Sequence, residues 1–155
     1  MKTAEIGKVS PALKLPATGE QVIDLKSLRG KNIVIYFYPK DSTPGCTNES
    51  NDFASQHSKF KRRNTVILGV SKDSIASHEK FKAKHNFPFE LLSDEDEQAC
   101  QIFDVIKEKN MYGRKFMGIE RSTFLIDEKG KLRREWRKVK VKGHVDEVLQ
   151  AVGDL

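Results

Sequence analysis

Cys46 is the residue of this chain whose surroundings most strongly indicate chemistry. It lies in a loop that reads Pro-Lys-Asp-Ser-Thr-Pro-Gly-Cys-Thr and follows the longest apolar run, residues 33–38. Pro44 fits the first turn of a helix, because the missing N–H of proline costs nothing there. Cys46 is therefore expected in that turn, where unpaired backbone N–H groups and the helix dipole favour negative charge. Both effects lower the pKa of a thiol below its free value of about 8.5, and the thiolate is the nucleophile.

The residues around this thiol narrow the chemistry it can perform. A lone cysteine is most often a small buried hydrophobe, but proline, threonine, glycine, asparagine and glutamate neighbours do not form an apolar core. A phosphatase loop would need arginine in place of Asp52, and a disulfide oxidoreductase would need a second cysteine in place of Glu49. No local pattern selects one of the four histidines as the base of a papain-like hydrolase. The reaction that remains is attack of the thiolate on a small electrophile such as a peroxide oxygen. Thr43, three residues earlier, is expected to bring its hydroxyl near the sulfur or its target.

Alternating strands and helices are predicted around this loop, from the spacing of apolar residues and the positions of turn residues. The predicted strands are 12–15, 21–25, 33–38, 66–70, 90–92, 121–126 and 131–136, and the predicted helices are 44–60, 74–85 and 144–152. The six apolar or aromatic residues of 33–38 predict a strand buried on both faces. Ser93 and the acidic residues after it predict the start of a further helix that carries Cys100. We expect one α/β domain over residues 1–155, with helices on both faces of a central sheet.

The composition is that of an ordinary globular domain of 155 residues, with 37% hydrophobic and 32% charged residues. No stretch approaches the roughly 20 apolar residues that span a bilayer, and the first residues lack the apolar core of a signal peptide. We therefore expect a cytoplasmic protein that does not enter membranes. Two cysteines are too few for a disulfide scaffold, and the four histidines lack ligand spacing with the thiols, so we expect no metal.

The net charge of +6 is concentrated in residues 129–142, where lysines and arginines alternate partly with apolar residues. A solvated strand face, with lysines guarding a sheet edge, explains this pattern without any partner. No helix-turn-helix, zinc-finger or RNP-like signature accompanies the charge. Binding of nucleic acid is therefore not expected.

Residues 39–46 match the pattern Pro-x-x-x-Thr-x-x-Cys, which resembles the active-site motif of peroxiredoxins. The longer string over 38–49 is similar to the bacterioferritin-comigratory-protein branch of that family, also called peroxiredoxin Q. Further similarity lies at 106–109, 111–113 and 118–127. Arg121 opens the run Arg-Ser-Thr-Phe within the last of these segments. The resemblance therefore extends, in order, over nearly the whole chain.

This resemblance implies a thioredoxin-like fold, in which a central mixed β-sheet is flanked by helices and preceded by an N-terminal β-hairpin. It also implies reduction of hydrogen peroxide and organic (alkyl) hydroperoxides, without metal, flavin, haem or any other cofactor. By position, Cys46 is the peroxidatic cysteine, which becomes a sulfenic acid. Thr43 would hydrogen-bond the peroxide, and Pro39 would shield the pocket from solvent. Arg121 would stabilise the thiolate and the charge developing on the peroxide. Glu49 would form an ion pair with Arg121.

The resolving thiol is the point at which the sequence departs from the family pattern. Many relatives carry it five residues after the nucleophile, where this chain has Asn51, or on the helix predicted at 74–85, which has no cysteine. Cys100 is the remaining candidate, and its pairing requires Cα atoms within about 7 Å, hence local unfolding around Cys46. Alternatively, Cys100 only packs under the sheet, and a small thiol or a partner protein resolves a one-cysteine enzyme. Thioredoxin or a similar dithiol is the expected reductant.

One function from another class is also compatible with these residues. A redox-sensing or chaperone-like binding protein would use oxidation of Cys46 to switch a partner surface, to which the basic stretch 129–142 would contribute. It would react slowly with peroxide and associate with its partner only when oxidised. Edge-strand lysines and the lack of a C-terminal extension favour a monomer in either case.

Overall fold

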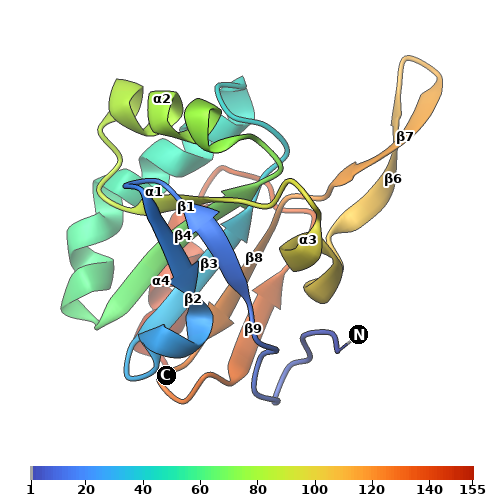
Figure 1. Ribbon diagram of the computed structural model, residues 1–155. Coiled ribbons are helices and arrows are strands. Elements are labelled where there is room, and N and C mark those ends of the chain that lie inside the picture. The colour runs from blue at the N-terminus through green and yellow to red at the C-terminus, as the bar shows by residue number, and fades with distance from the viewer. Residues whose placement is uncertain (1) are drawn as a thin grey trace.

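The computed structural model describes residues 2–155, which form a seven-stranded mixed sheet with helices on both faces (Figure 1). The strands follow the order β2-β1-β5-β4-β3-β8-β9 across the sheet. They are β1 (Lys14–Ala17), β2 (Gln21–Asp24), β3 (Asn32–Phe37), β4 (Thr65–Ser71), β5 (Glu90–Ser93), β8 (Ser122–Ile126) and β9 (Leu132–Trp136). The helices are α1 (Pro44–Arg62), α2 (Ile75–His85), α3 (Gln98–Ile102), α4 (His144–Gly153) and the 3-10 helix η1 (Leu25–Leu28).

Strand β3 runs through the interior of the sheet, parallel to β4 and antiparallel to β8. All of its residues are buried, so the prediction of a strand covered on both faces is confirmed. Successive side chains of a strand point to opposite faces, and they supply two separate cores here. Ile35 and Phe37 belong to one core, whereas Tyr36 and Tyr38 belong to the other.

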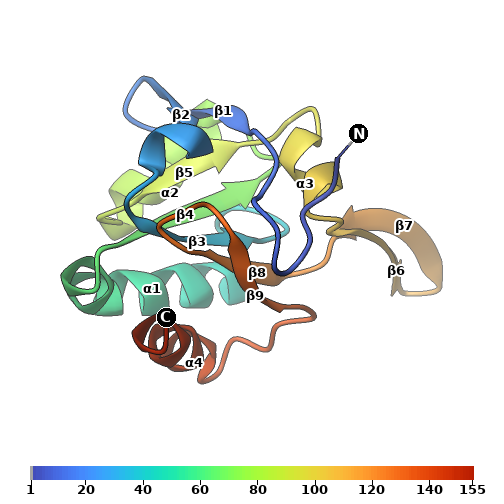
Figure 2. The ribbon, with the colours of Figure 1, turned by 90° about the horizontal axis from the view of Figure 1, so that it is seen from below.

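The two hydrophobic cores lie on opposite faces of the sheet. The first, called here the α1 core, packs the sheet against α1, α2 and α4 and contains Phe53, Phe81 and Val148. The second, the α3 core, packs the sheet against α3 and contains Leu15 and Phe103. Figure 2 shows α1 and α4 on one side of the strands and α3 on the other. The sheet therefore separates the helix that carries Cys46 from the helix that carries Cys100.

Most predicted elements are confirmed within two or three residues. The helices at 44–60, 74–85 and 144–152 correspond to α1, α2 and α4, and β8 pairs with β9 as the expected hairpin. The N-terminal hairpin is also present, because β1 pairs antiparallel with β2, although β1 begins two residues later than predicted. None of the helices within residues 2–155 is both long and apolar enough to cross a membrane.

The helix predicted directly after Ser93 begins later than expected. The acidic residues form a turn, and α3 starts only after Glu97, whose φ is 61°. The carboxylate of Asp94 accepts the backbone N–H groups of Ala99 and Cys100 across this turn. Asp94 therefore satisfies the exposed helix donors that Ser93 was expected to cap, and its side chain reaches them from outside the helix.

Sequence reasoning missed the hairpin formed by β6 (Ile106–Met111) and β7 (Arg114–Ile119). This ribbon projects from the body of the molecule (Figures 1 and 2), and most of its residues are exposed. A ribbon without a buried face does not need the apolar alternation by which strands are recognised in a sequence. The hairpin returns the chain to the sheet at Ile119, two residues before Arg121.

Candidate active site

Cys46 lies in the first turn of α1, as its sequence context predicts. Thr43 is the N-cap residue and Pro44 occupies the first turn, although the Thr43 side chain makes no capping hydrogen bond. Cys46 is 1% exposed and packs into the α1 core beside Tyr36 and Tyr38. The thiol is thus buried between the start of a helix and the aromatic residues of the strand that precedes it.

Contacts between β3, β4 and α1 fix the position of this helix turn. The Tyr36 hydroxyl lies 2.8 Å from the Ser50 hydroxyl, one turn beyond Cys46. Gly69 of β4 leaves the space that Tyr36 occupies, because a Cβ at that position would lie 2.8 Å from the tyrosine oxygen. The sheet therefore orients the first half of α1 through a buried hydrogen bond.

Arg121, directly before β8, brings its guanidinium group to the sulfur. Nη2 lies 3.4 Å from Cys46 Sγ, and Nη1 donates to Glu49 Oε1 at 2.7 Å. Residues three apart lie on one face of a helix, so the thiol and the carboxylate of α1 contact the same guanidinium. Gly45 leaves room for it, since a Cβ there would lie 3.1 Å from Nη2. The structure thus brings Cys46, Glu49 and Arg121 together.

The charges of this group depend on its burial. Glu49 is 0% exposed, and its Oε2 has no hydrogen-bond partner within residues 2–155. Burial raises the pKa of Glu49 to about 7, although the charge and hydrogen bond of Arg121 act to lower it. Burial acts to lower the pKa of Arg121, but Glu49 and Cys46 outweigh this effect and raise it. The guanidinium is therefore a permanent positive charge beside the sulfur.

Two further predicted site residues, Pro39 and Thr43, lie on the loop between β3 and α1. The Thr43 hydroxyl donates to the Lys40 carbonyl oxygen at 2.7 Å. Its only proton is committed to the loop, so its oxygen is available as an acceptor for an incoming O–H group. Pro39 is exposed at the start of the loop, and Thr43 is half-buried.

Lys109 of β6 is a further cation near the site that sequence reasoning did not single out. Burial and the positive charge of Arg121 lower the pKa of Lys109, whereas the negative charge of Cys46 acts to raise it. The ribbon that carries Lys109 has no apolar alternation, so the sequence offered no sign that its charge lies near those of Arg121 and Cys46. Gly45 was likewise visible only as part of a loop, because its role depends on where Arg121 lies.

Cys100, the candidate resolving thiol, is not brought to this site. Both cysteines are free and buried, but Cys100 belongs to the α3 core, on the other face of the sheet. Burial raises the pKa of the Cys100 thiol far above its usual value, and the nearby carboxylates of Asp94 and Glu97 raise it further. Cys100 is therefore a protonated thiol in an apolar and negatively charged setting.

One cluster contains the residue types that bind metal ions. Asp41, Asp73 and His78 each offer a ligand atom, and these atoms lie within 4.8 Å of one another. The carboxylate oxygens already accept hydrogen bonds: Asp41 from the Tyr38 hydroxyl and Asp73 from the Ser71 hydroxyl. Both ring nitrogens of His78 are also within hydrogen-bond distance of protein oxygens. A cation would have to displace these contacts, so the donor set does not fit a metal site.

Comparison with known proteins gives consistent matches. The family model described as "AhpC/TSA family" matches residues 6–135. The chain is 52% identical to peroxiredoxin Bcp of Bacillus subtilis over 153 residues, which cover 99% of this chain and 98% of the relative. It is 54% identical to peroxiredoxin Bcp of Xanthomonas campestris over 140 residues, 90% of this chain and 88% of the relative. A solved structure of Xanthomonas campestris peroxiredoxin Q superposes with a TM-score of 0.88 and 53% identity, covering 92% of this chain and 90% of that one.

Proposed function

The chain belongs to the AhpC/TSA family and is a thiol-dependent peroxidase with a thioredoxin-like fold, and from this premise we propose that Cys46 attacks the peroxide. The observation that supports this assignment is the 3.4 Å contact between Arg121 Nη2 and Cys46 Sγ. A fixed positive charge favours the thiolate over the thiol, and only the thiolate is strongly nucleophilic. Glu49 holds the guanidinium in place through its 2.7 Å hydrogen bond.

In the proposed step, the Cys46 thiolate attacks the terminal oxygen of R–O–O–H. A sulfur–oxygen bond forms, the O–O bond breaks, and the leaving RO⁻ takes a proton to depart as water or alcohol. Negative charge moves from sulfur to the leaving oxygen, where Arg121 offsets it. Cys46 becomes a sulfenic acid, and no metal, flavin or haem takes part.

Thr43 and Pro39 are proposed to orient the peroxide and shield it from water. The Thr43 oxygen, whose own proton goes to Lys40, is free to accept the hydroperoxide O–H and so turn the terminal oxygen toward the sulfur. Pro39 has no N–H and lies at the solvent side of the loop. Together they would select a substrate that carries an O–O–H group.

The proposed substrates are hydrogen peroxide and alkyl hydroperoxides, in a role of antioxidant defence. A solved bacterioferritin comigratory protein of Xanthomonas campestris, 52% identical to this chain, is described in terms of alkyl peroxide reduction activity and trapped intermediate/ligand complexes. That similarity supports an alkyl substrate for this chain, because it covers 92% of it.

We further propose that a thiol from outside the chain resolves the Cys46 sulfenic acid. Cys100 lies in the other core and is held protonated, so direct attack would require both large rearrangement and loss of a proton. Thioredoxin or a similar dithiol would then act as resolver and reductant. Two free cysteines accord with a reducing, cytoplasmic location, and we propose a monomer that acts as a single domain.

The experiment is intact-mass analysis after one equivalent of hydroperoxide, followed by a reductant-coupled NADPH assay. We expect a gain of about 16 Da that Cys46→Ser abolishes, or a mixed disulfide when a small thiol is present. A loss of about 2 Da that disappears in Cys100→Ser would show instead that Cys100 resolves the sulfenic acid. Peroxide consumption retained by Cys46→Ser would refute the assignment of the nucleophile.

The arginines of the basic stretch that motivated a redox-sensing function form ion pairs within the molecule, whereas its five lysines are exposed. Arg133 pairs with Asp127 at 3.3 Å, and Arg137 pairs with Glu135 at 3.0 Å. Exposed lysines beside paired arginines are typical of a solvated strand face at a sheet edge. The same NADPH assay separates the two functions, because a sensor would turn over peroxide slowly.

A further inference from the structure

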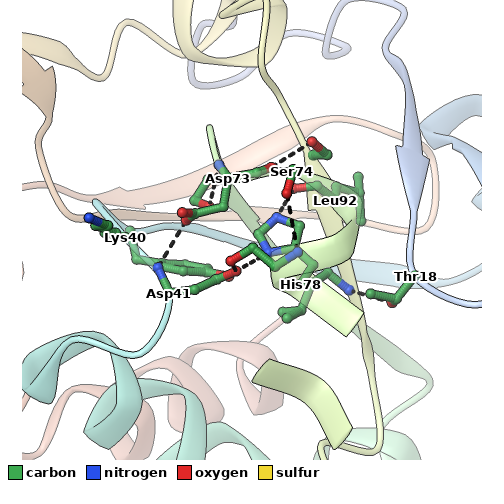
Figure 3. A network of polar contacts seen from close by, with 12 residues as sticks. Thr18, Lys40, Asp41, Asp73, Ser74, His78 and Leu92 are labelled. Atoms are coloured by element: carbon green, nitrogen blue, oxygen red, sulfur yellow. Dashed lines mark hydrogen bonds and ion pairs between the residues drawn. The ribbon is translucent and has the colours of Figure 1, made fainter. Parts of the chain in front are cut away.

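The loop between β3 and α1, residues 38–43, carries Pro39 and Thr43 and is held by one buried residue. Asp41 is 5% exposed, although both of its neighbours in the loop are exposed. Figure 3 shows its side chain directed away from α1, toward His78 on α2. The loop that would hold the peroxide is thus attached to α2.

Asp41 is joined by hydrogen bonds to the first residue of its own loop and to two neighbouring segments. Its Oδ1 accepts the Tyr38 hydroxyl at 2.6 Å, and its Oδ2 accepts the Ser77 hydroxyl at 2.8 Å. Its backbone N–H donates to Asp73 Oδ2 at 2.9 Å, in the turn between β4 and α2. His78 Nδ1 lies 2.7 Å from Asp41 Oδ2. The side chain and the backbone of one residue therefore anchor the loop to α2 and to the turn before it, and tie it to Tyr38 at its own start.

The contacts of His78 determine how many protons the pair holds. Nε2 lies 2.9 Å from the Leu92 carbonyl oxygen, which can only accept, so Nε2 carries a proton. Nδ1 faces a carboxyl oxygen, and a hydrogen bond between them needs one further proton, on either Nδ1 or Asp41. The ring is 0% exposed, so water cannot substitute for this bond. His78 and Asp41 therefore share one proton, whichever atom bears it.

Resting on the proposed function, we propose that His78 is a positioning residue of the peroxidase, which acts through this shared proton on the loop that carries Thr43. Asp41 is followed by Ser42, whose φ of 63° is a costly backbone conformation for a residue other than glycine. The Thr43 hydroxyl then returns to the Lys40 carbonyl. Without its anchor at Asp41, the loop would relax from this conformation and move the Thr43 oxygen relative to the sulfur.

Two amide variants separate the contacts of His78. The nitrogen of asparagine replaces Nδ1, so His78→Asn keeps a donor toward Asp41 and loses the bond to Leu92. The nitrogen of glutamine replaces Nε2, so His78→Gln keeps the bond to Leu92 and loses the donor toward Asp41. Because a misplacement of about 1 Å costs large factors in rate, we expect His78→Gln to lose at least about tenfold more kcat/KM for hydroperoxide than His78→Asn.

Stability is the necessary control, because both variants alter a buried polar group. Val148→Ala removes part of the α1 core on α4 and leaves the Asp41–His78 contacts in place. It shows how much kcat/KM falls for a given loss of Tm when only stability is changed. Equal rate losses in the two His78 variants, or losses proportional to the fall in Tm across all three proteins, would overturn the positioning role.

NMR gives a readout that does not depend on turnover. The shared proton predicts two slowly exchanging proton signals from the His78 ring. One comes from the proton on Nε2, and the other from the proton between Nδ1 and Asp41. We expect Asp41→Asn to remove the signal at Nδ1, because the amide N–H of asparagine can donate to Nδ1 and leave a neutral ring whose proton stays on Nε2, toward Leu92. Retention of both signals in Asp41→Asn would refute the shared proton. Cys46→Ser should keep both signals even though it is inactive, so failure of the proposed function and failure of this inference are distinguishable.

Discussion

The two cysteines of this chain are equally buried but have opposite surroundings. Cys46 is 1% exposed and Cys100 is 0% exposed, and each lies in the first turns of a helix packed on the sheet. The sulfur of Cys46 contacts the guanidinium of Arg121, whereas Cys100 faces the carboxylate of Asp94. Burial alone therefore does not decide whether a thiol can react. The sign of the charge that is buried beside it also contributes.

The two settings also differ in how the chain assembles them. Asp94 lies six residues before Cys100, so the negative environment of Cys100 is local. Arg121 is 75 residues from Cys46 and reaches it only because β8 pairs with β3. The positive charge beside Cys46 thus depends on strand pairing in the folded sheet, whereas the negative charge beside Cys100 comes from a neighbouring turn.

The largest expected effect comes from replacing each sulfur in turn. Cys46→Ser should lower kcat/KM for hydroperoxide by about 10³-fold or more, because the nucleophile itself is lost. Cys100→Ser should leave kcat/KM within about twofold and instead lower the free energy of unfolding by about 1–3 kcal/mol, since a hydroxyl is buried in the α3 core. Peroxide competition assays and urea unfolding measure the two quantities. A large rate loss in Cys100→Ser would contradict the division of roles.

The next largest effect comes from removing the cation that distinguishes Cys46. Arg121→Ala should lower kcat/KM by about 10²- to 10³-fold, which is typical of losing a fixed donor for developing negative charge. The change also leaves Glu49 buried without its partner, so stability should fall as well.

A double variant separates these two consequences of losing Arg121. Arg121→Ala combined with Glu49→Gln should regain stability but not rate. Recovery of the rate in the double variant would show that the guanidinium only neutralises Glu49.

The sequence sufficed for the Cys46 setting because each of its parts has a local signal. The apolar run of β3 and the proline after Thr43 locate the helix start, and the Arg-Ser-Thr-Phe run marks the strand that Arg121 directly precedes. The three-residue spacing of Cys46 and Glu49 places them on one helix face. Strand pairing brings these segments together. That pairing could be expected only from the resemblance to a known family.

Other features could not be read from the sequence, for physical reasons. His78 has helical spacing with apolar residues and looks like an ordinary core residue, because its partner Asp41 lies 37 positions away. The ribbon β6–β7 has no buried face, so its strands lack alternation. Ser93 has the side chain of a helix cap, but the carboxylate of Asp94 takes the helix donors instead.

A smaller expected effect is the dependence of stability on pH that Glu49, beside Cys46, gives to the protein. Its pKa is raised from 4.5 to about 7, so the folded state binds more protons than the unfolded state between these values. Stability from this group is present below pH 4.5 and is lost as the pH rises through 7, by at most about 3 kcal/mol. Glu49→Gln should remove this contribution to the pH dependence of stability, measured by urea unfolding at a series of pH values.

His144 opposes Glu49 in nearly the same pH range. Burial lowers its pKa from 6.5 to about 4, so its contribution is present above pH 6.5 and is lost as the pH falls toward 4. The stability of Glu49→Gln should therefore rise with pH in this interval. Glu108→Gln, at an exposed acid of β6, should leave the wild-type profile unchanged. An unaltered profile in Glu49→Gln would contradict the raised pKa.

The smallest expected effect tests whether charge or burial keeps Cys100 inert. Asp94→Asn removes a negative charge from its surroundings, so the pKa of Cys100 should fall, but burial is the largest cause of its elevation and should keep the pKa above the usual value. Ultraviolet titration of the thiolate in a Cys46→Ser background measures this directly, because only one thiol remains. The single amide oxygen introduced by Asp94→Asn can accept one of the two backbone N–H groups that the carboxylate now accepts, and loss of the other costs about 1 kcal/mol of stability. If Cys100 instead became as reactive toward peroxide as Cys46, a single carboxylate would account for the whole difference between the two thiols, and the cation at Cys46 would lose its special role.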